Sequence, residues 1–190
     1  MKIKQYVMAY GVEQDRLRAI LPDGYESLRP VLRINAEVRD DRHGYVEFNT
    51  AVEKDGNKGW LNIGYWEDVP FIRQEKKITF QTEFLEISFE CVGIESSCPA
   101  EKDNAGCYFI GEETTLRKPE FISSNKEFCD CAFQWKFATG DAHGVSISKT
   151  LPAYPQEVST VYPKQTFTAP NAASIPCNQV LGTYCVVFER

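Results

Sequence analysis

The stretch that decides the fold is Gln5–Trp66, which reads QYVMAYGVEQDRLRAILPDGYESLRPVLRINAEVRDDRHGYVEFNTAVEKDGNKGWLNIGYW. Tyr6–Tyr10 has the composition of a strand. Glu13–Leu21 then places its apolar residues on one helical face, and Pro22 ends that helix before an Asp-Gly turn. These signals predict a strand followed by a short helix, which is stable only when it packs on a sheet.

The strand predicted next, Val31–Val38, has the most regular alternation in the chain. Its apolar side carries Leu32, Ile34, Ala36 and Val38, and its polar side carries Arg33, Asn35, Glu37 and Arg39. Two further strands, Tyr45–Val52 and Gly59–Trp66, are joined through Asp55-Gly56-Asn57, which is a strong turn signal. The stretch therefore continues as an antiparallel meander.

Beyond Trp66 the chain consists of short β-rich segments separated by turn signals. The expected strands are Lys76–Val92 with a bulge or sharp bend between Phe84 and Leu85, Cys107–Gly111, Cys129–Phe137, Gly144–Thr150, Glu157–Tyr162 and Gly182–Glu189. Many short strands of this kind predict a mainly β fold. We expect residues 1–190 to form a single domain, a barrel-like antiparallel sheet with one or two short helices.

Composition excludes several classes of function. The 190 residues carry a net charge of −6 and no basic cluster, which argues against binding to nucleic acid or to anionic membranes. No apolar run is long enough to span a bilayer, and the N-terminus lacks the apolar core of a signal peptide. We therefore expect a cytoplasmic protein, and we leave open whether it forms a homo-oligomer.

The seven cysteines predict reduced thiols, because their number is odd and no signal peptide precedes them. Cys129 and Cys131 share a strand face with Phe133, Trp135 and Phe137, so we interpret them as core. No C-x-x-C or H-x-x-x-H spacing occurs, and the sequence predicts neither a metal site nor a cofactor. A nucleophilic Cys–His pair stays open.

The polar side of Val31–Val38 has two interpretations. Periodicity alone favours a solvated outer face by about two to one. Alternatively, the polar side chains face the interior and orient an acidic ligand, because Arg33 can pair with a carboxylate through two hydrogen bonds and Glu37 can set its geometry. The aromatic residue Trp60 could line a pocket for that ligand, although aromatic side chains more often build core.

Lys76 and Lys77 are the second candidate. Two adjacent ammonium groups repel each other, which favours loss of a proton from one of them, and a neutral lysine can form a Schiff base with a carbonyl. Lysine pairs also occur at strand edges, where they discourage edge pairing, and this surface interpretation is favoured by roughly four to one.

Four motifs in the opening stretch resemble the acetoacetate decarboxylase family over roughly the first third of the chain. They are the D-x-L-R-x-x-x-P element Asp15–Pro22, the strand motif Leu32-Arg33-Ile34, the segment Gly44–Glu47 and the hairpin end Trp60–Asp68. The resemblance implies a cone-like barrel around a small pocket. It also implies a lyase that acts on a small keto acid through a lysine Schiff base.

The resemblance implies a role for each matched residue. Lys76 or Lys77 would form the Schiff base, Glu47 would assist proton transfer, and Arg33 would hold the substrate carboxylate. The polar strand face and the aromatic pattern add Asn35, Glu37 and Trp60 as candidate substrate-binding residues. The chain departs from the family because no proline precedes the lysine pair and Asn35 stands where a glutamate is usual. There are two alternatives. One is a non-catalytic binding protein on the same scaffold, and the other is a structural or regulatory β-domain that binds nothing in a pocket.

Strand parity gives one further expectation about the lysines. Ile78 and Phe80 share the parity of Lys76 and have the character of core residues. We therefore expect Lys76 to point inward and Lys77 to face solvent.

Overall fold

A computed structural model describes residues 1–96, 107–110, 113–116, 121–122, 125–137, 148–150 and 159–190. The opening stretch forms an antiparallel meander interrupted by one helix, as its pattern predicted. Its elements are β1 (Lys2–Gly11), α1 (Gln14–Ile20), β2 (Glu26–Arg39), β3 (His43–Lys54) and β4 (Asn57–Glu67). Each strand is longer than its apolar pattern, because pairing with both neighbours continues past the alternating residues.

The remaining described elements complete one large sheet, add a separate pair of short strands and include a second helix. They are β5 (Phe71–Gln74), β6 (Lys77–Gln81), β7 (Leu85–Ser96), β8 (Cys107–Ile110), β9 (Glu113–Leu116), β10 (Phe121–Ile122), β11 (Lys126–Trp135), β12 (Ser148–Thr150), β13 (Ser159–Val161), α2 (Ala169–Ala173) and β14 (Gln179–Glu189). The strand order is β5-β6-β7-β11-β14-β1-β2-β3-β4-β8-β9, with β10 beside β14, and β12 pairs only with β13. The described sheet has two ends and is not closed, so the barrel that we expected is an open one.

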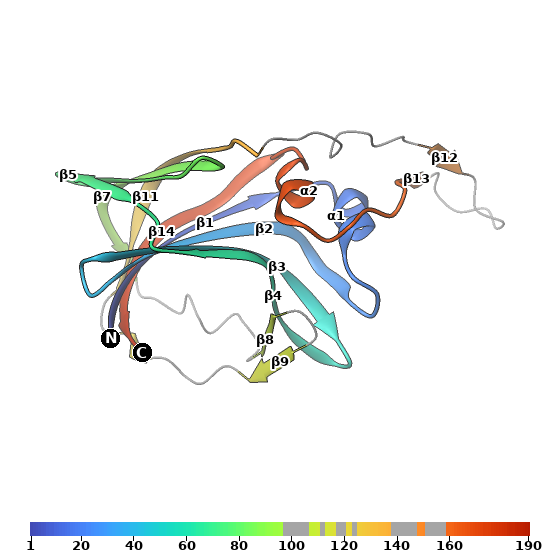
Figure 1. Ribbon diagram of the computed structural model, residues 1–190, viewed down its shortest axis with the longest axis horizontal. Coiled ribbons are helices and arrows are strands. Elements are labelled where there is room, and N and C mark those ends of the chain that lie inside the picture. The colour runs from blue at the N-terminus through green and yellow to red at the C-terminus, as the bar shows by residue number, and fades with distance from the viewer. Residues whose placement is uncertain (97–106, 111–112, 117–120, 123–124, 138–147, 151–158) are drawn as a thin grey trace.

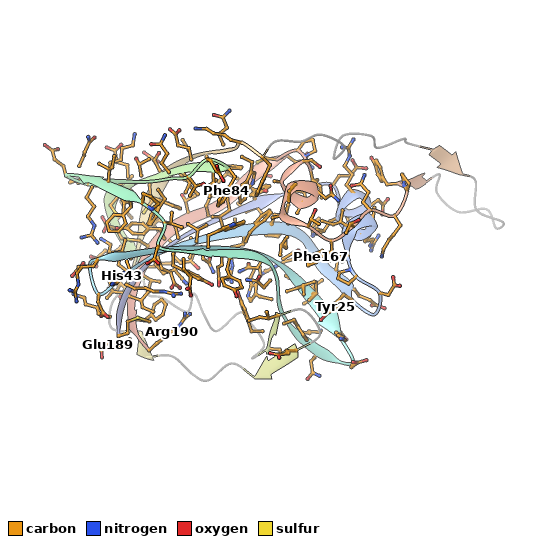
Figure 2. The ribbon with its side chains drawn as sticks, in the orientation of Figure 1. Tyr25, His43, Phe84, Phe167, Glu189 and Arg190 are labelled. Atoms are coloured by element: carbon orange, nitrogen blue, oxygen red, sulfur yellow. The ribbon has the colours of Figure 1, made fainter. Side chains whose placement is uncertain are left out.

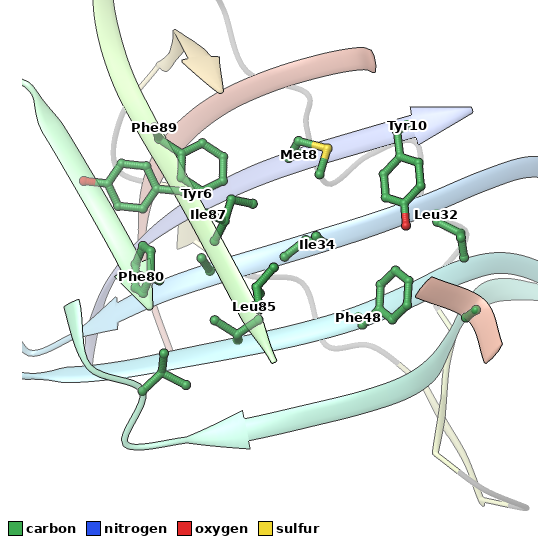
Figure 3. Close-up of a cluster of buried hydrophobic side chains, with 14 of the residues drawn as sticks. Tyr6, Met8, Tyr10, Leu32, Ile34, Phe48, Phe80, Leu85, Ile87 and Phe89 are labelled. Carbon is green, nitrogen blue, oxygen red and sulfur yellow. The ribbon is translucent and has the colours of Figure 1, made fainter. Parts of the chain in front are cut away.

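The sheet folds over on itself, so that β5, β6, β7 and β11 cover one face of β1–β4 (Figure 1). Apolar side chains of alternate residues fill the space between the two layers, as the close-up in Figure 3 shows. Tyr6 of β1 contacts Phe80 of β6 and Phe89 of β7, with ring centroids 6.1 and 5.3 Å apart. The core therefore lies on the apolar side of the opening meander (Figure 2).

Both helices are short and depend on the sheet. Leu17 and Ile20 of α1 are buried in the core. The helix α2 occupies a segment that the sequence indicated to be irregular. The side chain of Thr168 accepts a hydrogen bond from the backbone of Asn171 at its start, which satisfies one of the donors that every helix leaves open. Neither helix in the described part of the chain is long and apolar enough to cross a membrane.

The expected single strand Lys76–Val92 is two strands instead. β6 and β7 are joined by a turn in which the Thr82 hydroxyl accepts hydrogen bonds from the backbone of Phe84 and Leu85. The change of parity at Phe84 and Leu85 marks this reversal, which is sharper than the bulge we considered. Parts of three other expected strands, residues 111, 144–147 and 157–158, lie outside the described residues.

Candidate functional site

Both faces of β2 are buried, and one of them is polar. The exposed fractions of Arg33, Asn35 and Glu37 are 4%, 1% and 0%. The solvated-face interpretation was therefore wrong, and the interior alternative is confirmed for these side chains. Strand alternation could not distinguish the two, because a polar face looks the same in sequence whether water or protein covers it.

The centre of this polar face is the carboxylate of Glu47 on β3. Its Oε1 accepts hydrogen bonds from Nδ2 of Asn35 at 2.6 Å and Nδ2 of Asn49 at 3.1 Å. Its Oε2 accepts from the hydroxyls of Tyr108 at 2.7 Å and Tyr45 at 3.2 Å. Four donors from three strands therefore hold a carboxylate that is only 8% exposed.

Arg33 lies next to this carboxylate and is linked to it by Asn49. Nε of Arg33 donates to Oδ1 of Asn49 at 2.9 Å, while the amide nitrogen of Asn49 donates to Glu47. The guanidinium also lies 3.5 Å from the ring centroid of Trp60, a cation–π contact in a buried position. A cation, an aromatic ring and a carboxylate are thus placed together, with Asn49 hydrogen-bonded to both Arg33 and Glu47.

A second carboxylate, that of Glu37, is neutralised at the end of the same face. It accepts from Nε2 of Gln5 at 2.9 Å and from Nε of Arg39 at 2.8 Å, and Nη1 of Arg190 lies 3.6 Å away. The guanidinium of Arg39 in turn lies over the ring of Tyr45. Because two arginines compensate its charge, Glu37 supports the site rather than offering a reactive group.

The tyrosines that contact Glu47 stay protonated donors. Burial raises the pKa of the Tyr108 hydroxyl above its usual value, and the nearby charge of Glu47 raises it further. The pKa of Tyr45 is raised in the same way, by burial first and by Glu47 second. Both hydroxyls therefore keep their protons at neutral pH and can donate them to Glu47.

Two buried oxygens of the polar face have no hydrogen-bond partner among the described residues. They are Oε1 of Gln5 and Oδ1 of Asn35. Buried acceptors are nearly always paired with protein, water or a ligand. A molecule with a hydroxyl or N–H group could supply the missing donor beside Asn35, next to Glu47.

The lysine pair lies elsewhere. Lys76 is in the β5–β6 turn and Lys77 begins β6, and both are exposed. They line an open groove of about 390 Å³ together with Lys4 and Tyr6. Tyr6 points into the apolar core whereas the adjacent Gln5 bonds to Glu37, so the groove lies on the other face of β1 from the Glu47 cluster.

The parity expectation for Lys76 was therefore wrong. Lys76 precedes β6 in a turn, where strand alternation does not apply. Of the residues singled out in the sequence, Arg33, Asn35, Glu37, Glu47 and Trp60 come together on one face, and the two lysines do not join them.

The sequence pattern missed three members of the cluster, Asn49, Asn62 and Tyr108. Tyr108 arrives through a parallel pairing of β8 with β4, and its hydroxyl accepts from Asn62 at 3.1 Å. Pairing between segments this far apart in sequence leaves no local signal. Asn49 could have been found, because it has the same parity as Glu47 in the predicted strand.

Comparison with solved structures gives the relatives of this fold. An acetoacetate decarboxylase from Legionella pneumophila superposes with a TM-score of 0.68 at 10% identity, covering 99% of this chain and 82% of that one. An acetoacetate decarboxylase-like enzyme from Sphingomonas wittichii RW1 gives 0.57 at 8% identity, with 98% and 88% covered. The enduracididine biosynthesis enzyme MppR complexed with pyruvate gives 0.53 at 12% identity, with 98% and 84% covered.

By sequence, no protein-family model and no curated protein matches the chain. The structural likeness covers nearly the whole chain, so restricting the resemblance to the first third was wrong. At these identities the likeness establishes the acetoacetate decarboxylase-like fold.

Proposed function

We propose that this chain binds a small molecule with a carboxylate group at the buried polar face around Glu47. The observation that carries the proposal is the hydrogen-bonded Glu47 carboxylate, placed by Asn49 next to the Arg33–Trp60 pair. Burying a charged carboxylate is costly unless donors compensate it. A buried carboxylate that is surrounded by donors from several strands is typical of a binding or catalytic site.

Each residue has a distinct part in the proposed complex. Arg33 attracts the carboxylate of the ligand, and the Trp60 ring keeps the guanidinium in place. The unpaired oxygen of Asn35 accepts a hydrogen bond from a hydroxyl or enol of the ligand. Glu47, with protonated Tyr108 beside it, is positioned to exchange a proton with the ligand. A small keto acid has all of these groups.

The solved structures support the choice of ligand by analogy of fold alone. One of them is named as an acetoacetate decarboxylase, another as an acetoacetate decarboxylase-like enzyme, and MppR is complexed with pyruvate. Because one fold hosts many functions, the assignment for this chain depends on its own residues. Thermal-shift measurements with acetoacetate and pyruvate test it first, and a rise in Tm that is absent for Arg33→Met is the expected result.

A lysine-dependent lyase is the second candidate function. The observation that favours it is the groove beside β1, where Lys76 and Lys77 lie with Lys4 and Arg73. Such a collection of cations can attract an anionic keto acid, and the acids Asp41, Glu75 and Glu127 line the same groove. The groove is open, however, whereas Schiff-base chemistry of this type benefits from a site that excludes water.

Borohydride trapping tests the lyase directly. If it is correct, treatment with acetoacetate and borohydride gives a covalent adduct on Lys76 or Lys77, and alanine in place of the trapped lysine abolishes any decarboxylation. Lys58→Ala, which removes an exposed lysine of β4, is the matched control. Folded protein without an adduct on either lysine would remove this candidate and leave the binding proposal standing.

A further inference from the structure

Three cysteines that are distant in sequence converge inside the fold. Cys91 of β7, Cys129 of β11 and Cys185 of β14 lie on three neighbouring strands. Sγ of Cys91 is 3.7 Å from Sγ of Cys129 and 3.7 Å from Sγ of Cys185, and all three sulfurs lie within 4.8 Å of one another. We call these residues the sulfur cluster. None of the three forms a disulfide.

The spacing matches the separation of two sulfur ligands around one metal ion, and it is also the distance of an S–H···S contact. Zinc binds thiolate sulfur at about 2.3 Å, and two sulfurs at tetrahedral angles around it lie about 3.8 Å apart. Two of the sulfur separations in the cluster have this length. The cluster is therefore nearly in place for coordination, with only small rotations of the side chains needed.

Lys4 lines the groove beside the sulfur cluster and places a positive charge there. Three thiolates and a divalent ion carry one net negative charge, which Lys4 can offset. The protons displaced on binding leave to the solvent.

An entry path exists as well. Cys91 lines the open groove of about 390 Å³ beside β1, together with Lys4, Tyr6 and Glu127. Cys129 and Cys185 lie deeper, at 5% and 4% exposure. An ion arriving through this groove meets Cys91 first and keeps one coordination position toward the groove, which water can occupy as in sites with three protein ligands.

We propose that Cys91, Cys129 and Cys185 form a three-thiolate binding site for a thiophilic divalent metal ion of the Zn²⁺ class. Soft sulfur ligands select such ions over Mg²⁺ or Ca²⁺. This site lies on the other side of β1 from the Glu47 cluster, and it does not depend on the function proposed there. Spacing rules along the sequence could not find it, because each strand contributes one ligand.

Cobalt titration of the reduced, metal-free protein under anaerobic conditions tests the site. We expect one equivalent of Co²⁺ to give thiolate-to-cobalt charge-transfer and tetrahedral visible bands, and Zn²⁺ to displace it and raise Tm. Cys129→Ser should lower the affinity by about 100-fold or more, since even outer-shell changes cost 10- to 100-fold. Cys177→Ser, which removes an exposed thiol, should bind like the wild type.

A second measurement keeps the test decisive if Cys129→Ser does not fold. Cys91 is only partly buried, so Cys91→Ser is the milder variant and should lose the same bands. In the wild type, Zn²⁺ should slow alkylation of the three cluster cysteines but not of Cys177. Absence of charge-transfer bands, equal affinity in Cys91→Ser and wild type, unprotected thiols, or binding of Cu⁺ without Zn²⁺ would each overturn the proposal.

Discussion

A buried carboxylate is tolerated only where donors surround it, and Glu47 has four of them. We predict that Glu47→Gln lowers the free energy of unfolding by about 1–3 kcal/mol, because an amide group cannot accept from all four donors at once. Chemical denaturation measures the change. Glu67→Gln, at an exposed position of the neighbouring strand β4, should leave the midpoint unchanged, and equal effects of the two variants would contradict the role of Glu47.

The raised pKa of Tyr108 predicts how the free energy of unfolding changes at alkaline pH. The folded protein raises its pKa, so above about pH 10 the unfolded chain ionises first and binds fewer protons than the folded chain. This contribution to stability is therefore complete below pH 10 and is lost as the pH rises above it. Unfolding in urea at pH 8, 10 and 11 should show a shallower decline for Tyr108→Phe than for the wild type. Parallel declines would show that Tyr108 does not titrate in this way.

Residues of this site differ in how far sequence could place them. The alternation of β2 identified Arg33, Asn35 and Glu37 as one polar face, but not whether protein covers it. Glu47 entered through a family resemblance, and Trp60 as an aromatic residue that could line a pocket. Tyr108 could not be found, since only the pairing of β8 with β4 brings its hydroxyl to Glu47.

At the scale of elements, the pairing of β4 with β8 completes the site. It requires a close approach at Gly59, where a Cβ would lie 2.1 Å from the carbonyl oxygen of Cys107. We predict that Gly59→Ala separates the two strands and lowers the free energy of unfolding by about 1–3 kcal/mol, the usual cost of overpacking. Tyr108 would then move away from Glu47.

The matched control for that prediction is Gly182→Ala in β14, where an added Cβ meets nothing within 4 Å. Thermal unfolding compares the two variants, and hydrogen exchange at the amides of β8 reports the pairing itself. Unchanged exchange at β8 in a folded Gly59→Ala protein would show that the pairing does not depend on this glycine.

Elements with strong local patterns were predictable, and those set by distant partners were not. The alternation of β2, the turn at Gly56 and the apolar face of α1 all carry local signals, and these elements were confirmed. The reversal between β6 and β7 left only a parity change at Phe84 and Leu85. The sulfur cluster left no signal, because its members come from β7, β11 and β14.

At the scale of the whole molecule, one meander carries an apolar core face and a buried polar face. The apolar face of β1–β4 packs under β5–β7 and β11 (Figure 1), and the polar face holds the Glu47 cluster. The two termini meet at the end of this arrangement, where the N-terminal ammonium of Met1 donates to the backbone oxygen of Arg190 at 2.7 Å. Arg190 also lies near Glu37. The contact between the two termini is therefore adjacent to the polar face.

The most direct measurement of the central claim is calorimetric titration of the wild type and Arg33→Met with acetoacetate, pyruvate and methyl acetoacetate. We predict that the wild type binds the two acids but not the ester, and that Arg33→Met weakens binding by about 10- to 100-fold, the value of one charge-assisted hydrogen bond. Arg42→Met, at an exposed arginine of the turn between β2 and β3, should bind like the wild type. Binding of the ester as tightly as the acids, or equal affinity in Arg33→Met and wild type, would contradict carboxylate recognition at this face.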